Sequence, residues 1–297
     1  MKAAIFKYIL ALLLFGTNGI VASFIAMSSH EIVLLRTLIG SLFLIFVFLL
    51  SGGKFSTRKN RRDFVFVMIS GIAMGASWIL LYEAYTLIGV SLASLVYYCG
   101  PVIVLGLSPW IFRERLKPAS LLGFAAVLLG LYFVNLESMR LGEISWGILY
   151  GILSAVLYAV MVIFNKLATK ITGLKNATYQ LVTAFLTVAL FTLIKQGASI
   201  RIESDSVVPL LLLGLVNTGI GCYLYFSSID QLSAGSVAIV GYLEPLSAVI
   251  FSAIFLREQL SSLQILGAIL ILGGAAFGEL LRIRSTKRAD APASLPS

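Results

Sequence analysis

One acidic residue stands inside a long apolar segment, where it could exchange a proton or hold a cation. Glu244 lies near the middle of the run 234–256, which is long enough to cross the roughly 30 Å hydrocarbon core of a bilayer. A carboxyl group at that depth is costly in lipid and normally faces protein or water. Two roles remain open for Glu244: a proton- or cation-responsive group facing a central cavity, or a structural carboxyl group stabilising a helix kink at Pro245.

Two further ionisable residues fall inside apolar runs. Glu83 lies in the run 64–85 and Arg36 in the run 32–51, both close to the same side of the membrane. A long basic side chain near the end of a span can reach the interface. We expect Arg36 to do so or to pair with Glu83, and substrate contact by either residue is the alternative.

Aromatic side chains cluster around the same positions. Tyr98 and Tyr242 each stand three residues before a proline, Pro101 and Pro245. A cavity lined by such rings would suit an amphipathic organic solute better than a bare ion, whereas for any single ring core packing or an interfacial place is the alternative. The candidate rings are Trp78, Tyr82, Tyr97, Tyr98, Tyr223, Tyr225 and Tyr242.

Ten apolar runs carry these residues, each about as long as a spanning helix requires. They are 7–27, 32–51, 64–85, 91–112, 118–136, 145–167, 176–194, 207–229, 234–256 and 262–281. A mean hydropathy of +1.01 excludes an ordinary soluble domain. The sequence therefore predicts an all-α membrane protein with ten transmembrane helices, the first of them retained rather than cleaved as a signal peptide.

The chain repeats itself at a separation of 144 residues. GPVIVLGLSPWIFRERL from Gly100 matches EPLSAVIFSAIFLREQL from Glu244, so that Pro101 corresponds to Pro245. A proline removes one helical hydrogen bond, and both prolines are expected to bend or unwind their spans. Gly75 and Gly219 correspond in the same way, and we mark them as further possible break positions.

The repeat predicts how the chain is organised. Each half contains five spans, an odd number, so the second half enters the membrane inverted relative to the first. Inverted repeats place a binding site near the midplane, between the halves. We expect a first repeat at 1–140, a second repeat at 141–284 and a disordered cytoplasmic tail at 285–297.

Charge indicates orientation rather than a nucleic-acid partner. Alternate connecting segments carry most of the 22 Lys and Arg residues, which places both termini in the cytoplasm by the positive-inside rule. The net charge of +9 is explained by this topology. Cys99 and Cys222 lie in apolar runs and are interpreted as small buried residues. No spacing indicates a metal site, and no motif indicates a cofactor or an ATP-binding loop.

The doubled motif resembles the EamA-type drug/metabolite transporters. The stretch Pro…Arg-Glu-x-Leu occurs twice, each time followed by a helix with paired glycines, LLGFAAVLLG and ILGAILILGG. This resemblance implies an inner-membrane carrier, often an exporter of amino acids or other metabolites. The motif in that family usually has a glycine before its Glu, where this chain has Arg113 and Arg257.

The leading functional hypothesis is a secondary transporter that exports a small organic metabolite, an amino acid or a related amphipathic solute, by alternating access. Proton antiport, exchange and facilitated diffusion all stay open. A membrane-embedded enzyme and a non-transporting receptor are the alternatives, but the sequence offers neither an HExxH motif nor a nucleophile–base pair, and its loops are short. The expected partners are the substrate and membrane lipid, with the chain acting as a monomer or homodimer.

Overall fold

The computed structural model describes residues 2–54, 61–111, 122–123, 125–130, 132–133, 136, 145–197, 202–229 and 240–289. Every regular element within these ranges is a helix. The described part contains six helices long and apolar enough to cross a membrane and three shorter apolar helices. The prediction of an all-α membrane protein is confirmed. Of the predicted span 118–136, residues 118–121, 124, 131, 134 and 135 lie outside the described residues.

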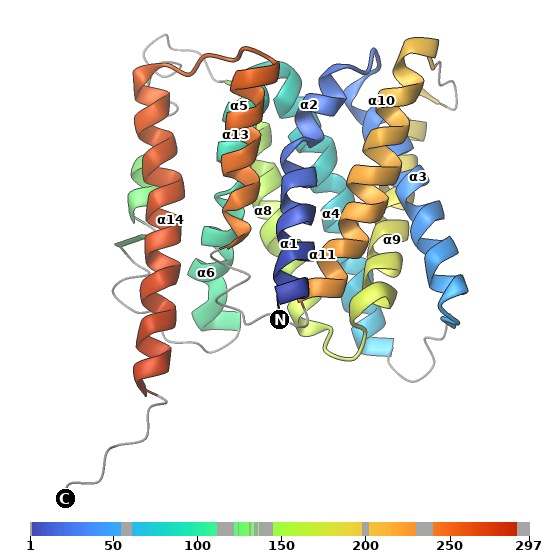
Figure 1. Ribbon diagram of the computed structural model, residues 1–297, viewed down its shortest axis with the longest axis horizontal. Coiled ribbons are helices and arrows are strands. Elements are labelled where there is room, and N and C mark those ends of the chain that lie inside the picture. The colour runs from blue at the N-terminus through green and yellow to red at the C-terminus, as the bar shows by residue number, and fades with distance from the viewer. Residues whose placement is uncertain are drawn as a thin grey trace, which may run out of the picture.

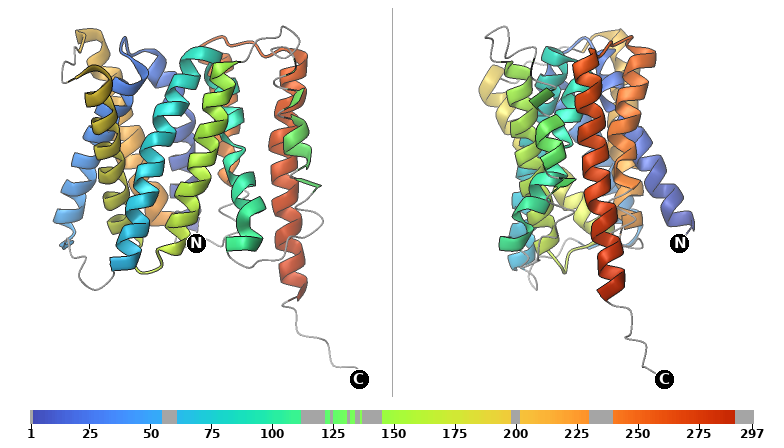
Figure 2. Two further views of the ribbon diagram at one scale, coloured as in Figure 1. Left: turned by 180° about the vertical axis from the view of Figure 1, so that it is seen from behind. Right: turned by 90° about the vertical axis from the view of Figure 1, so that its left-hand side faces the viewer.

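The helices stand side by side in one bundle (Figures 1 and 2). The first half contains α1 (Lys2–Gly16), α2 (Asn18–Ser23), α3 (Ser29–Leu50), α4 (Arg61–Ile88), α5 (Val90–Tyr97) and α6 (Gly100–Ile111). The second contains α8 (Trp146–Leu167), α9 (Gly173–Gln196), α10 (Val207–Leu211), the π-helix η2 (Leu212–Ile220), α11 (Gly221–Ile229), α13 (Leu243–Phe255) and α14 (Ser262–Ala289). The helix α14 extends into the range 285–297 predicted as a tail, and residues 290–297 lie outside the described ranges.

Corresponding helices of the two halves run in opposite directions. The start of α3 meets the end of α9, where His30 Nε2 lies 2.8 Å from Gln196 Oε1. The helices α4 and α8, the third span of one half and the first span of the other, are neighbours that also run antiparallel: the end of α4 meets the start of α8, where Gly147 packs against Ile88. Since α3 and α9 are each the second span of their half, this antiparallel arrangement is the geometry of an inverted repeat.

Small residues let the central helix α4 approach its neighbours closely. Ser77 of α4 donates a 2.9 Å hydrogen bond to the carbonyl of Ser154 in α8, and Ser154 Oγ donates a 2.8 Å bond to the carbonyl of Ser77. A Cβ atom on Gly75 would come 2.7 Å from the backbone oxygen of Ala184 in α9. The expectation of a helix break at Gly75 is wrong, because α4 is continuous from Arg61 to Ile88 and the glycine serves close packing.

Within the residues that the structure describes, three spans are interrupted near the middle of the bundle. Between α5 and α6, Tyr98 and Cys99 separate the helices just before Pro101, and α13 begins at Leu243, two residues before Pro245. The third interruption, at Thr17 between α1 and α2, has no proline and was not anticipated from the sequence.

The span 207–229 is irregular without being interrupted. Its central part is the π-helix η2, and Gly219 lies within it. A Cβ atom on Gly219 would come 2.8 Å from the ring of Phe43 in α3. Gly219 therefore combines a non-standard helical turn with close packing between the two halves.

One carboxylate joins the end of α13 to the start of α5. Glu258 accepts hydrogen bonds from the backbone N–H groups of Val90, at 2.7 Å, and Ser91, at 2.8 Å. These N–H groups would otherwise be unsatisfied at the helix start. The preceding residue, Arg257, has a φ of 54°, in the left-handed region that favours glycine. Arg257 stands where the family motif usually has glycine, so the departure noted in the sequence falls on a strained backbone position.

Candidate functional site

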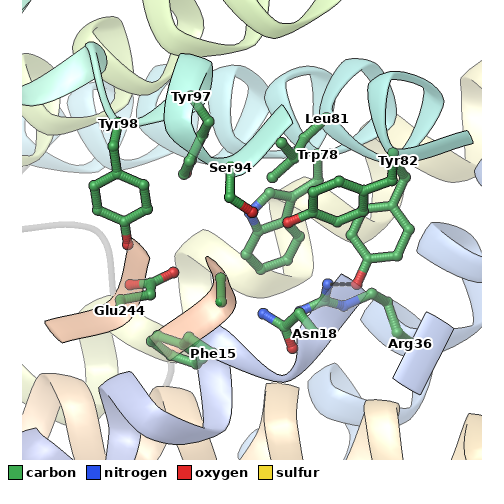
Figure 3. Close-up of a pocket in the computed structure, with 12 residues that line it drawn as sticks. Phe15, Asn18, Arg36, Trp78, Leu81, Tyr82, Ser94, Tyr97, Tyr98 and Glu244 are labelled. Atoms are coloured by element: carbon green, nitrogen blue, oxygen red, sulfur yellow. Dashed lines mark hydrogen bonds between the residues drawn. The ribbon is translucent and has the colours of Figure 1, made fainter. Parts of the chain in front are cut away.

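A polar pocket lies inside the bundle, between elements of both halves (Figure 3). Its lining residues are Phe15, Asn18, Arg36, Trp78, Leu81, Tyr82, Tyr85, Ser94, Tyr97, Tyr98, Glu244 and Ala248. They come from α1, α2, α3, α4, α5 and α13, with Tyr98 in the break after α5. The pocket therefore combines aromatic walls with two ionisable side chains and an amide, the mixture expected of a site for a small organic molecule.

All three helix interruptions contribute to this pocket. Phe15 and Asn18 flank the break at Thr17, Tyr98 lies in the break between α5 and α6, and Glu244 lies in the first turn of α13. Interrupted helices at mid-membrane are tolerated where their backbone groups are buried in protein or line a cavity. The three interruptions thus lie beside the pocket, and the neighbouring side chains of Asn18, Tyr98 and Glu244 contribute polar atoms to its lining.

Arg36 is buried, with only 1% of its surface exposed. Its Nε donates a 2.9 Å hydrogen bond to Thr218 Oγ1, and its Nη1 donates to the hydroxyl of Tyr82. The guanidinium carbon lies 4.6 Å from the centre of the Trp78 ring and 5.1 Å from that of Tyr82. The expectation that Arg36 reaches the membrane interface is wrong, because its face of α3 packs against α4 and η2.

Glu83 does not pair with Arg36. It accepts a hydrogen bond from the hydroxyl of Ser29 at the start of α3, and it is absent from the pocket lining. Its neighbour Tyr82 faces Arg36, and consecutive residues of an α-helix point in directions about 100° apart. Among the described residues, no carboxylate lies within salt-bridge distance of Arg36, so the predicted Arg36–Glu83 pair is wrong.

Glu244 and Arg36 stand at opposite ends of the pocket in Figure 3. Glu244 is partly buried, and the Tyr98 hydroxyl points toward its carboxylate (Figure 3). The space between the two charges is walled by aromatic rings, among them Trp78 and Tyr97. The arrangement offers one cationic and one anionic group to the same enclosed space, without a direct bond between them.

Of the ten candidate residues, Tyr225 lies against the rings of Tyr8 and Phe15, and six others line this pocket. They are Arg36, Trp78, Tyr82, Tyr97, Tyr98 and Glu244. Glu83 lies elsewhere, as described above. Tyr223 packs against the core group containing Leu44 and Met74, and Tyr242 against the group containing Leu95 and Val96.

Sequence reasoning missed several lining residues. Asn18, Tyr85 and Ser94 contribute polar atoms, and Phe15, Leu81 and Ala248 contribute apolar surface. A usable signal existed for Asn18, since the pair Thr17-Asn18 is polar inside the otherwise apolar run 7–27. The described residues include no cluster of three or more His, Cys, Asp or Glu side chains that could hold a metal ion.

An all-helical membrane bundle whose interrupted spans converge on a central polar pocket is the architecture of a membrane transporter. The chain belongs to the EamA-like transporter family, whose model matches it twice, at residues 2–136 and 145–278.

Individual relatives agree with this family. The chain is 26% identical over 282 residues to "Uncharacterized transporter YxxF" of Bacillus subtilis, covering 93% of this chain and 89% of that protein. It is 26% identical over 211 residues to a "Probable amino-acid metabolite efflux pump" of Salmonella typhimurium, covering 66% and 70% of the two chains. It is 22% identical over 235 residues to "Uncharacterized inner membrane transporter YhbE" of Escherichia coli, covering 75% and 73%.

The fold also matches a solved structure. A chain titled "Crystal structure of protein" superposes with a TM-score of 0.68 at 22% sequence identity, covering 94% of this chain and 98% of that one. The likeness extends over the whole bundle and concerns the fold alone.

Proposed function

We propose that this protein is a secondary transporter that exports a small zwitterionic, partly apolar metabolite such as an amino acid, by alternating access. The observation that carries this proposal is the pair Arg36 and Glu244, which face one aromatic-walled pocket from opposite ends. A zwitterion would place its carboxylate at Arg36 and its ammonium group at Glu244. Each buried charge would then gain a partner, which offsets the cost of its desolvation.

Arg36 suits the carboxylate end of such a substrate. A guanidinium group has five N–H donors, and the two hydrogen bonds found for Arg36 go to neutral hydroxyl groups of Thr218 and Tyr82. Within the described part of the chain the other N–H groups have no hydrogen-bond partner, so they can form charge-assisted bonds with a carboxylate, which are roughly twice as strong as neutral ones. The neighbouring Trp78 and Tyr82 rings hold the guanidinium group in place by cation–π contact.

Export across the inner membrane is supported by the relatives. The Salmonella typhimurium relative is named an efflux pump and the Escherichia coli relative an inner membrane transporter. We place both termini in the cytoplasm on the distribution of Lys and Arg, in agreement with α1 starting and α14 ending at the same end of the bundle (Figure 1). Since one chain forms the pocket, a single chain is the proposed transport unit, surrounded by lipid and acting without a cofactor or catalytic step.

Counterflow in sealed proteoliposomes tests the proposal. Vesicles loaded with one unlabelled amino acid should accumulate its labelled form, and a panel of amino acids, their amides and the matching decarboxylated amines defines the selectivity. We expect amino acids with apolar or aromatic side chains to exchange and the amines to fail. Arg36→Gln should abolish this exchange, whereas Arg62→Gln is the matched control, because Arg62 also stacks on an aromatic ring but lies outside the pocket.

A chain that exchanges none of these zwitterions, or exchanges the amines as well as the amino acids, would refute the proposal. An Arg36→Gln variant that exchanges amino acids as fast as the parent would show that the proposed carboxylate-binding residue is not needed.

A further inference from the structure

We infer that Thr218 and Asn217, two residues of the π-helix that do not line the pocket, position its recognition groups: Thr218 fixes Arg36, and Asn217 fixes the interruption that carries Asn18. The inference rests on the proposed function, because it assigns to Arg36 the carboxylate of the substrate. It adds to that function the element that sets the geometry of the site.

The hydroxyl group of Thr218 has a fixed orientation. It donates its hydrogen to the carbonyl of Leu213 at 2.8 Å, five residues back along the π-helix. A hydroxyl group has a single hydrogen, so its oxygen must be the acceptor of the 2.9 Å bond from Arg36 Nε. Thr218 has no exposed surface, so water does not compete for this bond. The π-helical turn therefore holds one edge of the guanidinium group and leaves the other edge to Tyr82 and the pocket.

Close packing brings Thr218 within reach of Arg36. Gly40 lies one turn after Arg36 on α3, and a Cβ atom there would come 2.7 Å from Thr218 Cγ2. A Cβ atom on Gly214 would likewise come 2.7 Å from Ile39 Cβ. Two glycines, one on each helix, thus allow the contact that the Arg36–Thr218 bond requires.

Asn217 connects the same π-helix to a second element of the pocket, the break between α1 and α2. Its Nδ2 lies 2.9 Å from the carbonyl of Leu14, 2.9 Å from Thr17 Oγ1 and 3.1 Å from Asn18 Oδ1. These three acceptors surround the break between α1 and α2, and Asn217 is 1% exposed. The backbone N–H of Thr17 donates to the same Leu14 carbonyl at 3.1 Å, three residues back, so the regular helical hydrogen bonding is already altered where Asn217 binds. Asn217 therefore stabilises the interruption and holds Asn18 in the pocket wall.

These contacts give the π-helix a specific role. Neighbouring residues on η2 bind a recognition group on α3 and the break between α1 and α2, so one irregular turn sets the distance between two walls of the pocket. Such turns are rare and occur frequently at functional sites. A regular α-helix would direct Asn217 and Thr218 differently and lose one of the two contacts.

The test of the Thr218 half uses Thr218→Val, which keeps the shape of the side chain and removes the hydroxyl. In proteoliposomes, KM for an exchanged amino acid should rise about tenfold, as expected for one lost hydrogen bond to a charged group, while KM for its amide and the maximal rate change little. Thr218→Ser, which restores the hydroxyl, should restore KM. Thr192→Val is the matched control, because Thr192 is equally buried and its hydroxyl has no partner among the described residues.

Asn217→Ala tests the other half whether or not Thr218→Val folds. It should raise KM for the amino acid and the amide alike, by about fivefold, because it loosens a wall that both compounds contact. Three outcomes would each overturn the inference. In Thr218→Val, KM could change equally for the amino acid and its amide; in Thr218→Ser, KM could stay raised; and in Asn217→Ala, KM could stay unchanged. A parent protein that exchanges no amino acid would instead refute the proposed function.

Discussion

Replacing Glu244 by glutamine separates the charge of this side chain from its packing. The Tyr98 hydroxyl points toward the Glu244 carboxylate (Figure 3), and the amide oxygen of glutamine can also accept a hydrogen bond, in a side chain of nearly equal volume. We therefore expect Glu244→Gln to fold as the parent does. The variant loses a negative charge. In the proposed site, this charge binds either the ammonium group of the substrate or a proton.

The ionisable groups around Glu244 do not change their protonation state between pH 5 and 8. They are Tyr8 of α1, Arg36 of α3, Tyr85 of α4, Tyr97 and Tyr98 at α5, Tyr158 of α8, Cys222 and Tyr225 of α11, and Tyr242 before α13. In ordinary surroundings, phenols, thiols and guanidinium groups all titrate above this interval. Among these described groups, Glu244 is the one carboxyl group and the one suited to exchange a proton during transport.

The size of the effect follows from the contact that is lost. A hydrogen bond to a charged group contributes about 1.5–3 kcal/mol, so KM for a zwitterion should rise roughly 10- to 100-fold in Glu244→Gln. At saturating substrate the variant should still exchange amino acids. In the parent, a proton from an acidic outer solution would bind Glu244 and displace the ammonium group of the substrate, and release of this proton to the less acidic cytoplasm would reset the site. Glutamine cannot bind the proton, so net export by the variant should no longer respond to a pH gradient.

The assay measures net efflux from proteoliposomes with and without an acidic outer solution, beside counterflow at saturating substrate. Glu83→Gln is the matched control, since Glu83 lies in another apolar span, binds Ser29 and does not line the pocket. An efflux of Glu244→Gln that responds to the gradient as the parent does would leave Glu244 with a structural role beside Pro245.

Three further predictions concern stability and are measured as thermal unfolding of detergent-solubilised protein. Glu258→Ala should lower stability by about 1–2 kcal/mol through loss of the α5 cap, and a parental melting temperature would contradict this role. Arg257→Gly should raise the melting temperature because the φ of 54° costs about 1–2 kcal/mol with a Cβ atom, whereas Arg257→Ala should bring no such gain. Gly75→Ala should destabilise by about 1–3 kcal/mol, because its Cβ would meet backbone, while Gly273→Ala, with open space around it, should not.

Much of the fold follows from hydropathy and the repeat. The apolar runs predicted the spans, and the odd number of runs in each half predicted their inversion. The chain breaks just before Pro101 and Pro245 because proline lacks the N–H that a continuous helix needs. Aromatic rings next to those prolines reach the pocket at Tyr97 and Tyr98, but Tyr242 turns to the core instead.

The remaining parts of the site depend on contacts between distant residues. The break at Thr17 has no proline, and although Gly16 and Gly19 flank it, its stabilisation depends on the distant Asn217, whose amide lies within hydrogen-bond distance of the Leu14 carbonyl and of Thr17 Oγ1. The π-helix likewise leaves no local signature. The direction of Arg36 could not be predicted, because a helix that is apolar on all sides does not reveal which face packs against protein.

The two halves share a scaffold but not their charges, and this difference has a consequence for transport. At the repeat offset of 144, Arg36 corresponds to Gln180 and Glu244 to Gly100. Gln180 lies in a neutral buried network, where it donates to Ser70 Oγ at 2.8 Å and accepts from Asn165 Nδ2 at 2.9 Å. A pocket with identical groups from both halves could bind a zwitterion in two opposite orientations. Because the cation comes from one half and the anion from the other, one orientation satisfies both charges, and the proposed substrate would keep that orientation while access passes from one side of the membrane to the other.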